Sequence, residues 1–260
     1  MGFQAERYPM YSDPQAAPFF LLGSNTGVLL LHGFTSTPQS VRYVGESLHA
    51  ASGATVLAPL LKGHGSSPED LGQTCFKDWL RSAEQALEEV SKHCRTIVAA
   101  GLSLGGTLAL NIAIRHPDKV RAVTTINGST GLYSAEHAAK FLETDSNIYF
   151  DGIGSDIRDE TAREICYDRI PARAIRERYF LTLSTGMMLP LLRQPILILQ
   201  SRTDHVVDPR NAERIAMECG STDIRLRWLE NSFHVATLDH DKDLIVNELA
   251  DLLGRCDGIE

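Results

Sequence analysis

The residues Thr96 to Arg115, TIVAAGLSLGGTLALNIAIR, decide how the rest of the chain is organised. Thr96 to Ala100 form a short apolar run of the kind that makes a buried strand. Thr107 to Arg115 carry apolar residues at helical spacing. Between them lies the turn Gly101-Leu102-Ser103-Leu104-Gly105-Gly106. We therefore expect a strand, a sharp turn and a helix, in that order.

The turn has the pattern G-x-S-x-G, which between a strand and a helix is the pattern of a nucleophile elbow. Gly101 and Gly105 fit this turn because adjoining backbone passes too close for a Cβ atom. The helix that follows directs its N-terminal N–H groups and the positive end of its dipole at the serine oxygen. The five-residue pattern alone is common, so the flanking strand and helix carry the prediction. Ser103 is the candidate nucleophile.

Length, charge and cysteine usage narrow the class of protein. The 260 residues suit one α/β domain with an insertion, or two small domains. A net charge of −8 argues against nucleic acid as a partner and against electrostatic binding to anionic lipid. The start of the chain lacks the apolar core of a signal peptide, and no run approaches the roughly 18 apolar residues of a spanning helix. Five scattered cysteines without C-x-x-C indicate reduced thiols, so we expect a soluble cytoplasmic protein.

Short apolar runs alternate with amphipathic segments along most of the chain. The predicted strands cover residues 19–22, 27–31, 54–58, 96–100, 120–126, 195–200 and 225–229. The predicted helices cover residues 39–50, 77–94, 107–115, 211–217 and 241–253. Continuous apolar strands that alternate with helices predict an α/β fold, with a mostly parallel sheet covered on both faces.

The strand pattern lapses between Gly128 and Arg193, an interval too long for a structureless loop. Helix-like segments occur at 135–141, 156–167 and 172–183, and an apolar stretch ends at Leu192. We expect a core made of residues 1–128 and 194–260. Residues 129–193 are then an inserted helical cap over the C-terminal edge of the sheet, where open α/β folds bind ligands.

A nucleophilic serine needs a base, and the base needs an orienting acid. Asp204 follows the strand 195–200, and His234 follows the strand 225–229, so both lie at the strand ends where Ser103 emerges. We assign Asp204 as the acid and His234 as the base. Asp208 is a rival acid, although Pro209 and the helix after it suggest an N-cap region.

Two other histidines compete with His234 for the role of base. His205 adjoins the acid in sequence, which leaves poor geometry for a hydrogen bond between the two side chains, and His240 lies at the start of the last helix. His32 and His64 are expected to brace loops. The spacing of the histidines shows no H-E-x-x-H or comparable metal-ligand pattern, so no metal site is expected.

An oxyanion hole needs two preorganised backbone donors. One is the N–H of Leu104, the residue after the nucleophile, and the other should come from the loop that begins His32-Gly33-Phe34. Phe34 is placed to provide it.

With these residues in place, the chain resembles the α/β-hydrolases, and among them the small bacterial monoacylglycerol lipases. The resemblance is carried by HGFTSTPQS (32–40), KGHGSSPEDL (62–71), GLSLGG (101–106), GIGSDIRDE (152–160), QSRTDHVVDP (200–209) and WLENSFHVATLDHDKDLI (228–245). A related carboxylesterase group shares several of these motifs and has a different cap.

The resemblance implies that Ser103, Asp204 and His234 form a catalytic triad, with Phe34 and Leu104 at the oxyanion hole. It implies hydrolysis of monoacylglycerol, a small-molecule substrate, to glycerol and fatty acid, and it implies no cofactor.

Two cap residues match family positions that bind the substrate. Glu164 matches a cap glutamate that recognises glycerol, and Ile153 matches a residue at the narrowing of the acyl channel. The segment 131–151 departs from the family pattern, so acyl preference is not carried over. A solvated carboxylate on a charged helix is the alternative for Glu164.

Several alternatives stay open from the sequence. The apolar piece from Leu183 to Leu192 lines the acyl channel or touches lipid transiently, or it only packs the cap on the core. A general carboxylesterase for short to medium acyl esters is the main rival function, and a non-catalytic receptor is another. Haloalkane chemistry needs a carboxylate where Ser103 stands. The oligomeric state is not predicted.

Overall fold

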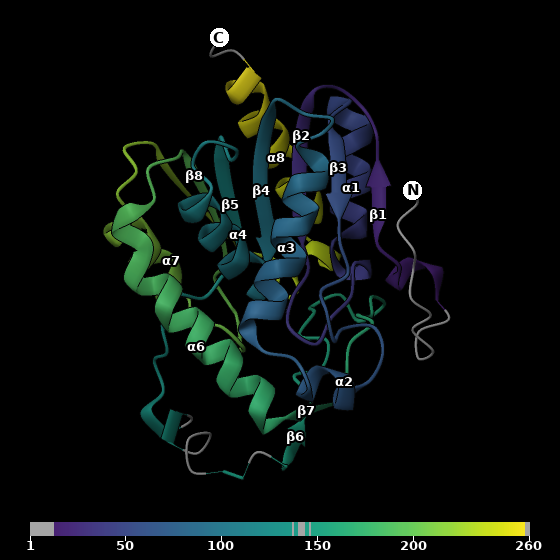
Figure 1. The fold of residues 1–260 in the computed structure, drawn as a ribbon, viewed down its shortest axis with the longest axis vertical. Helices are drawn as coiled ribbons and strands as arrows, with labels where there is room; N and C mark the ends of the chain where they lie inside the picture. The colour runs from purple at the N-terminus through teal and green to yellow at the C-terminus, as the bar shows by residue number, and fades with distance from the viewer. Residues whose placement is uncertain (1–12, 137, 140–143, 146, 258–260) are drawn as a thin grey trace.

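The computed structural model describes residues 13–136, 138–139, 144–145 and 147–257, and within them the main sheet has seven strands (Figure 1). The spatial order is β1-β3-β2-β4-β5-β8-β9, in which β1 runs antiparallel to β3 and the other neighbours are parallel. The strands are β1 (Phe19–Leu21), β2 (Thr26–Leu31), β3 (Thr55–Ala58), β4 (Thr96–Leu102), β5 (Ala122–Ile126), β8 (Ile196–Ser201) and β9 (Ile224–Leu229).

Helices separate the strands along the chain. Within the described residues, the α-helices include α1 (Gln39–Ser52), α2 (Pro68–Gly72), α3 (Phe76–Val90), α4 (Leu104–Arg115), α6 (Ala172–Met188), α7 (Arg210–Glu218) and α8 (Lys242–Asp257). Three short 3₁₀ helices are η1 (Pro14–Ala16), η2 (Leu189–Leu191) and η3 (Ala236–Leu238). An antiparallel hairpin of β6 (Tyr149–Asp151) and β7 (Arg169–Pro171) lies apart from the main sheet.

The five inner strands of the sheet are buried on both faces, which explains their largely apolar sequences. In β2, Leu29 and Leu31 pack into the cluster that holds residues of α3 and α4. Val28 and Leu30 pack into the opposite cluster, with residues of α1 and α8. Figure 1 shows α3 and α4 in front of the sheet and α1 and α8 behind it. The predicted mostly parallel sheet with helices on both faces is therefore confirmed.

The predicted helix over 156–167 is wrong, because these residues form an irregular strap. Several backbone groups of the strap bond to the core, although the N–H of Ala162 donates to the carbonyl of Asp159 within it. The side chain of Gln39 donates to the carbonyl of Arg163 and accepts the N–H of Ile165. The N–H of Tyr167 donates to the carbonyl of Thr35 at 3.1 Å. Such bonds replace the i→i−4 bonds of a helix.

Other differences are smaller. Helix α3 ends at Val90 rather than at residue 94, α6 runs on to Met188, and the β6–β7 hairpin was not anticipated. Residues 137, 140 and 141 of the predicted helix 135–141 lie outside the described residues. Among the described helices, none is long and apolar enough to cross a membrane.

Candidate active site

Ser103 occupies a sharp turn between β4 and α4. Its backbone has φ 54° and ψ −117°, a conformation that L residues rarely adopt. A Cβ atom at Gly105 would lie 2.1 Å from the carbonyl oxygen of Leu31, and one at Gly101 would lie 2.2 Å from the carbonyl carbon of Gly105. Both glycines are therefore required by close backbone approach, as the sequence pattern predicted.

Sheet register places the loop after β2 beside this turn. Strands β2 and β4 are parallel neighbours, with Leu31 opposite Gly101, so the residues that follow each strand lie at the same edge. The His32 ring braces this loop, because Nδ1–H donates to the carbonyl of Gly33 at 2.9 Å and Nε2 accepts the N–H of Leu61 at 3.1 Å. Burial, with a smaller effect of His64, holds the pKa of His32 well below its usual value, so this ring is neutral.

The candidate acid and base meet across the ends of β8 and β9. His234 Nδ1 lies 2.9 Å from Asp204 Oδ2. Asp204 Oδ1 accepts the N–H groups of Val206 and Val207 at 2.9 and 2.8 Å. Burial alone would raise the pKa of Asp204, but the charge and hydrogen bond of His234 and these N–H groups outweigh it and lower the pKa. Asp204 is therefore a buried carboxylate that stays ionised beside the imidazole.

The rival residues are engaged elsewhere. Asp208 forms an ion pair with Arg210, at 2.6 Å, at the start of α7. The His205 ring bonds to Asp156 Oδ1 at 2.8 Å, and the Nε2 atom of His240 lies 4.0 Å from Asp239. Only His234 of the three histidines reaches Asp204 through a hydrogen bond within the described residues.

Five of the sequence-predicted residues line one small cavity of about 20 Å³, which holds roughly one water molecule. They are Ser103, His234, Phe34, Ile153 and Glu164. No hydrogen bond joins the Ser103 hydroxyl to His234 in the described part of the chain, and such bonds often form only when substrate is bound. The side chain of Leu104 is buried in the core instead, which leaves only its backbone N–H, the first of α4, for the site.

Glu164 is half-buried on the irregular strap, so the alternative of a solvated carboxylate on a charged helix is wrong. Its N–H donates to Ser155 Oγ at 3.0 Å. Burial raises the pKa of its carboxyl group, against the smaller lowering effects of Ser36, His234 and Cys166. Burial and the neighbouring Glu164 in turn raise the pKa of the Cys166 thiol to about 12, so this thiol is protonated.

Sequence reasoning missed three residues that hold the site together. Asn127, at the end of β5, donates to the carbonyl of His234 at 2.7 Å and accepts the N–H of Ser201 at 2.7 Å. Asp156 Oδ2 accepts the N–H of His234 at 3.1 Å. Asp239 accepts N–H groups from Arg158 and Phe233. The positive φ of Asn127, 49°, at a strand end is the kind of feature that no sequence pattern revealed.

Among the residues that the structure describes, no three His, Cys, Asp or Glu side chains gather as a metal site would require.

Comparison with known proteins links this geometry to a family of enzymes. Residues 28–248 match the model of the alpha/beta hydrolase family. The chain is 38% identical to the thermostable monoacylglycerol lipase of Bacillus sp. (strain H-257), over 96% of this chain and 98% of that protein. It is 29% identical to a carboxylesterase of Bacillus subtilis (strain 168), over 92% and 97% of the two chains. A solved structure from a study of the metagenome-derived lipolytic enzymes LipS and LipT superposes with a TM-score of 0.89, at 38% identity, over 93% of this chain and 98% of that one.

Proposed function

Because the chain belongs to the alpha/beta hydrolase family, we propose that it is a serine hydrolase that cleaves monoacylglycerol to glycerol and fatty acid. The observation that supports this most directly is the position of His234. Its Nδ1 atom bonds to Asp204, and its ring lines the same cavity as Ser103. The similarity to a monoacylglycerol lipase over nearly the whole chain supports the substrate class.

The reaction follows from the tautomer that this geometry favours. With Nδ1–H donated to Asp204, the lone pair of His234 Nε2 is left to accept a proton. Ser103 Oγ attacks the ester carbonyl carbon while its proton passes to Nε2. Collapse of the tetrahedral intermediate breaks the ester bond, and His234 protonates the departing glycerol oxygen. A water molecule, deprotonated by the same ring, then attacks the acyl-enzyme and frees the fatty acid.

Two backbone donors stabilise the charge that develops on the carbonyl oxygen. We assign them to the N–H groups of Phe34 and Leu104. The loop of Phe34 lies beside the serine turn, and Leu104 begins α4, whose positive dipole end adds to the effect.

Substrate recognition is divided between two cap residues. Glu164 binds the glycerol hydroxyl groups, since its half-buried carboxyl group opens onto the Ser103 cavity. Ile153 lines both this cavity and a larger one of about 360 Å³, which is consistent with a place where the acyl channel narrows. We treat residues 129–193 as the cap that carries both.

The alternative is a general carboxylesterase for short to medium acyl esters. One observation favours it: the larger cavity next to Ile153 is lined by Asp151, Arg178 and Tyr179 as well as by apolar side chains. A long alkyl chain would meet polar groups there.

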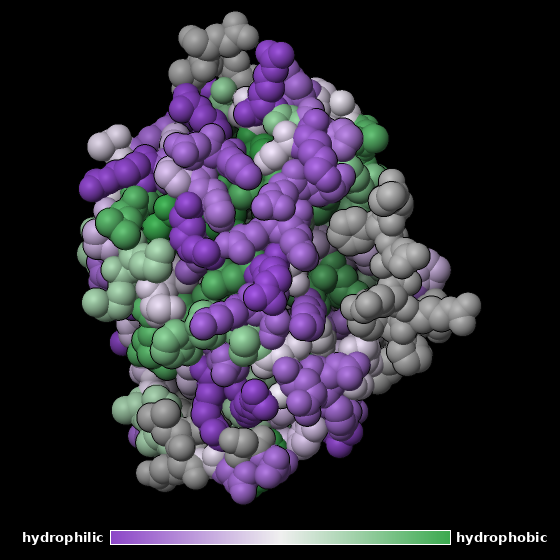
Figure 2. Space-filling model, viewed as in Figure 1, coloured by the Kyte–Doolittle hydropathy of each residue, from purple (hydrophilic) through white to green (hydrophobic). Residues whose placement is uncertain are grey.

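The cap carries an exposed apolar strip, which would suit an enzyme that meets its substrate at a lipid surface. Phe180, Leu183, Met187 and Leu191 are exposed and follow helical spacing along α6 and η2. Figure 2 shows apolar side chains exposed on the left of the face over α6. We propose transient contact of this strip with lipid. The five cysteines are free thiols, which fits a reducing compartment such as the cytoplasm.

Turnover of 1-monooleoylglycerol and of p-nitrophenyl butyrate tests the proposal. Ser103→Ala should lower kcat on both esters by about 10³-fold or more, because only residual catalysis remains without the nucleophile. Ser91→Ala, at the distant C-terminal end of α3, is the control. Near-native turnover by Ser103→Ala would end the serine-hydrolase proposal. A higher kcat/KM on p-nitrophenyl butyrate than on 1-monooleoylglycerol would favour the alternative, a general carboxylesterase.

A further inference from the structure

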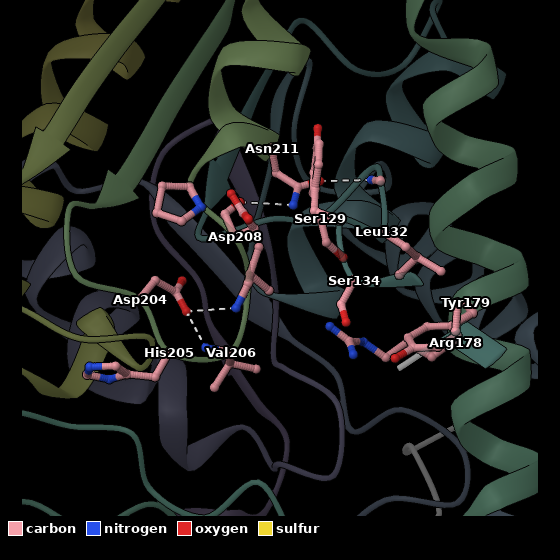
Figure 3. A pocket seen from close by; sticks show the side chains of 15 residues that line it. Ser129, Leu132, Ser134, Arg178, Tyr179, Asp204, His205, Val206, Asp208 and Asn211 are labelled. Atoms are coloured by element: carbon pink, nitrogen blue, oxygen red, sulfur yellow. Dashed lines mark hydrogen bonds between the residues drawn. The ribbon is translucent and has the colours of Figure 1, made fainter. Parts of the chain in front are cut away.

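Two hollows larger than the Ser103 cavity lie next to it under the cap. The first, of about 360 Å³, shares Phe34 and Ile153 with the Ser103 cavity. The second, of about 300 Å³, shares Arg178, Tyr179, His205 and Val206 with the first (Figure 3). Arg178 therefore lies where the two hollows meet, and Glu164 lines neither of them.

Arg178 projects from α6 toward the loop that carries Asp204, as Figure 3 shows. Its Nε atom is buried and has no hydrogen-bond partner among the described residues. The guanidinium carbon lies 5.8 Å from the centre of the Phe34 ring. An aromatic face attracts a cation but cannot accept its several N–H groups in hydrogen bonds.

The carboxylates in the walls of the hollows have other partners or face solvent. Asp156 bonds to His205, Asp204 bonds to His234, and Asp208 bonds to Arg210. Asp151 is exposed at the end of β6. Arg178 is thus the lining arginine whose guanidinium no described carboxylate engages by a hydrogen bond.

Burial makes this cation costly. It lowers the pKa of Arg178, while the charges of Tyr179 and Asp204 oppose that effect. Arg178 as a whole is half-buried, and a guanidinium whose Nε is withdrawn from water is favourable only when an acceptor satisfies that buried donor. A carboxylate is the acceptor that matches its planar fork, with two parallel hydrogen bonds.

We propose that Arg178 binds a carboxylate at the far end of the acyl group, so that the enzyme hydrolyses monoesters of dicarboxylic acids. The inference rests on the proposed function, since it takes the hollow beyond Phe34 and Ile153 as the acyl side of the site. The ester carbonyl lies at Ser103, the acyl chain passes Ile153, and its terminal carboxylate meets Arg178.

The test compares monomethyl suberate with methyl octanoate, whose acyl chains have the same length and differ in the terminal carboxylate. We expect the ratio of kcat/KM, charged over neutral ester, to fall by about 10- to 100-fold in Arg178→Gln, the loss of one charge-assisted interaction. Arg178→Lys should keep part of the preference. Arg173→Gln removes the same charge from an exposed position on α6 and should leave the ratio unchanged.

The inference is overturned if Arg178→Gln leaves the ratio unchanged. It is also overturned if both esters lose activity equally, which would make Arg178 an electrostatic support for Asp204. Calorimetric binding of monomethyl suberate to Ser103→Ala, with and without Arg178→Gln, separates this question from catalysis. Failure of the wild-type protein to cleave 1-monooleoylglycerol and p-nitrophenyl butyrate would instead defeat the proposed function, and loss of monomethyl suberate binding in the double variant would still decide the role of Arg178.

Discussion

The carboxylate of Asp156 accepts the backbone N–H of His234 at 3.1 Å. The same carboxylate bonds to the ring of His205 at 2.8 Å and accepts the N–H of His205 at 3.3 Å. His205 follows Asp204 directly, so one side chain of the strap holds both the loop of the candidate acid and the loop of the candidate base.

Removal of this carboxylate should misplace the imidazole. We expect Asp156→Ala to lower kcat by about 10- to 100-fold, because small displacements of catalytic groups cost rate. The free energy of unfolding should fall by about 1–3 kcal/mol, the cost of leaving buried donors unpaired. Ester turnover and urea unfolding measure the two effects. Glu160→Ala, which removes an exposed carboxylate from the same strap, should change neither, and unchanged kcat in Asp156→Ala would contradict the positioning role.

The strained backbone at Ser103 should lower the stability of the fold in exchange for the position of the nucleophile. The residue has φ 54° and ψ −117°, which glycine adopts without a steric penalty. Ser103→Gly should therefore be about 1 kcal/mol more stable than Ser103→Ala, since strain relief exceeds the added entropy of the unfolded chain. Both variants lack the hydroxyl and should be inactive. Urea denaturation compares them, and an alanine variant as stable as the glycine variant would contradict the strain.

The role of Glu164 is tested by changing the leaving alcohol. Glu164→Gln should lower kcat/KM on 1-monooleoylglycerol by about tenfold, because a carboxylate binds hydroxyl groups more strongly than an amide does. Methyl oleate lacks the glycerol hydroxyl groups and should lose much less. Equal losses on the two esters would remove the glycerol role. Glu160→Gln serves as the control for loss of a cap carboxylate.

Acid should weaken the fold through His64. Burial lowers the pKa of His64 from 6.5 to about 4, so the folded chain keeps this ring neutral while the unfolded chain protonates it. Its contribution to stability is complete above pH 6.5 and is lost progressively as the pH falls toward 4. The loss is about 2 kcal/mol near pH 5.

Urea unfolding between about pH 7 and pH 5 checks this linkage. Between pH 7 and pH 5, the free energy of unfolding of His64→Gln should fall by about 2 kcal/mol less than that of the wild type. His93→Gln removes an exposed imidazole, 39% accessible, and should keep the wild-type slope. Equal slopes in all three proteins would show that His64 is protonated alike in both states.

Sequence patterns predicted the core because strands that are buried on both faces need apolar residues along most of their length. Each apolar run of the main sheet became a strand, and β2 at Thr26–Leu31 differs from its predicted range by one residue. The helix predicted over 156–167 is wrong because the residues of the strap have helical spacing, while the partners of its backbone groups are distant in the sequence. Gln39 and Asp239 take up its backbone groups, and no local pattern encodes bonds across about 80 or more residues.

The same limit applies to the candidate site. Ser103, Asp204 and His234 follow strand ends in the order expected, and two of them are joined by a hydrogen bond. Asn127, Asp156 and Arg178 could not be found in this way. Their importance comes from which loops they join or which hollow they face, and that is settled only when the strands are assembled.

The position of Asp239 in the chain also has a consequence for the synthesis of the protein. Its carboxylate, which accepts the N–H groups of Arg158 and Asp159, lies 81 residues further along the chain than Arg158. A polypeptide still on the ribosome therefore exposes its elbow serine well before it possesses the anchor for the strap. The strap can be anchored only after residue 239 has been synthesised, and a message cut short ahead of codon 239 would encode a serine turn with an untethered cover.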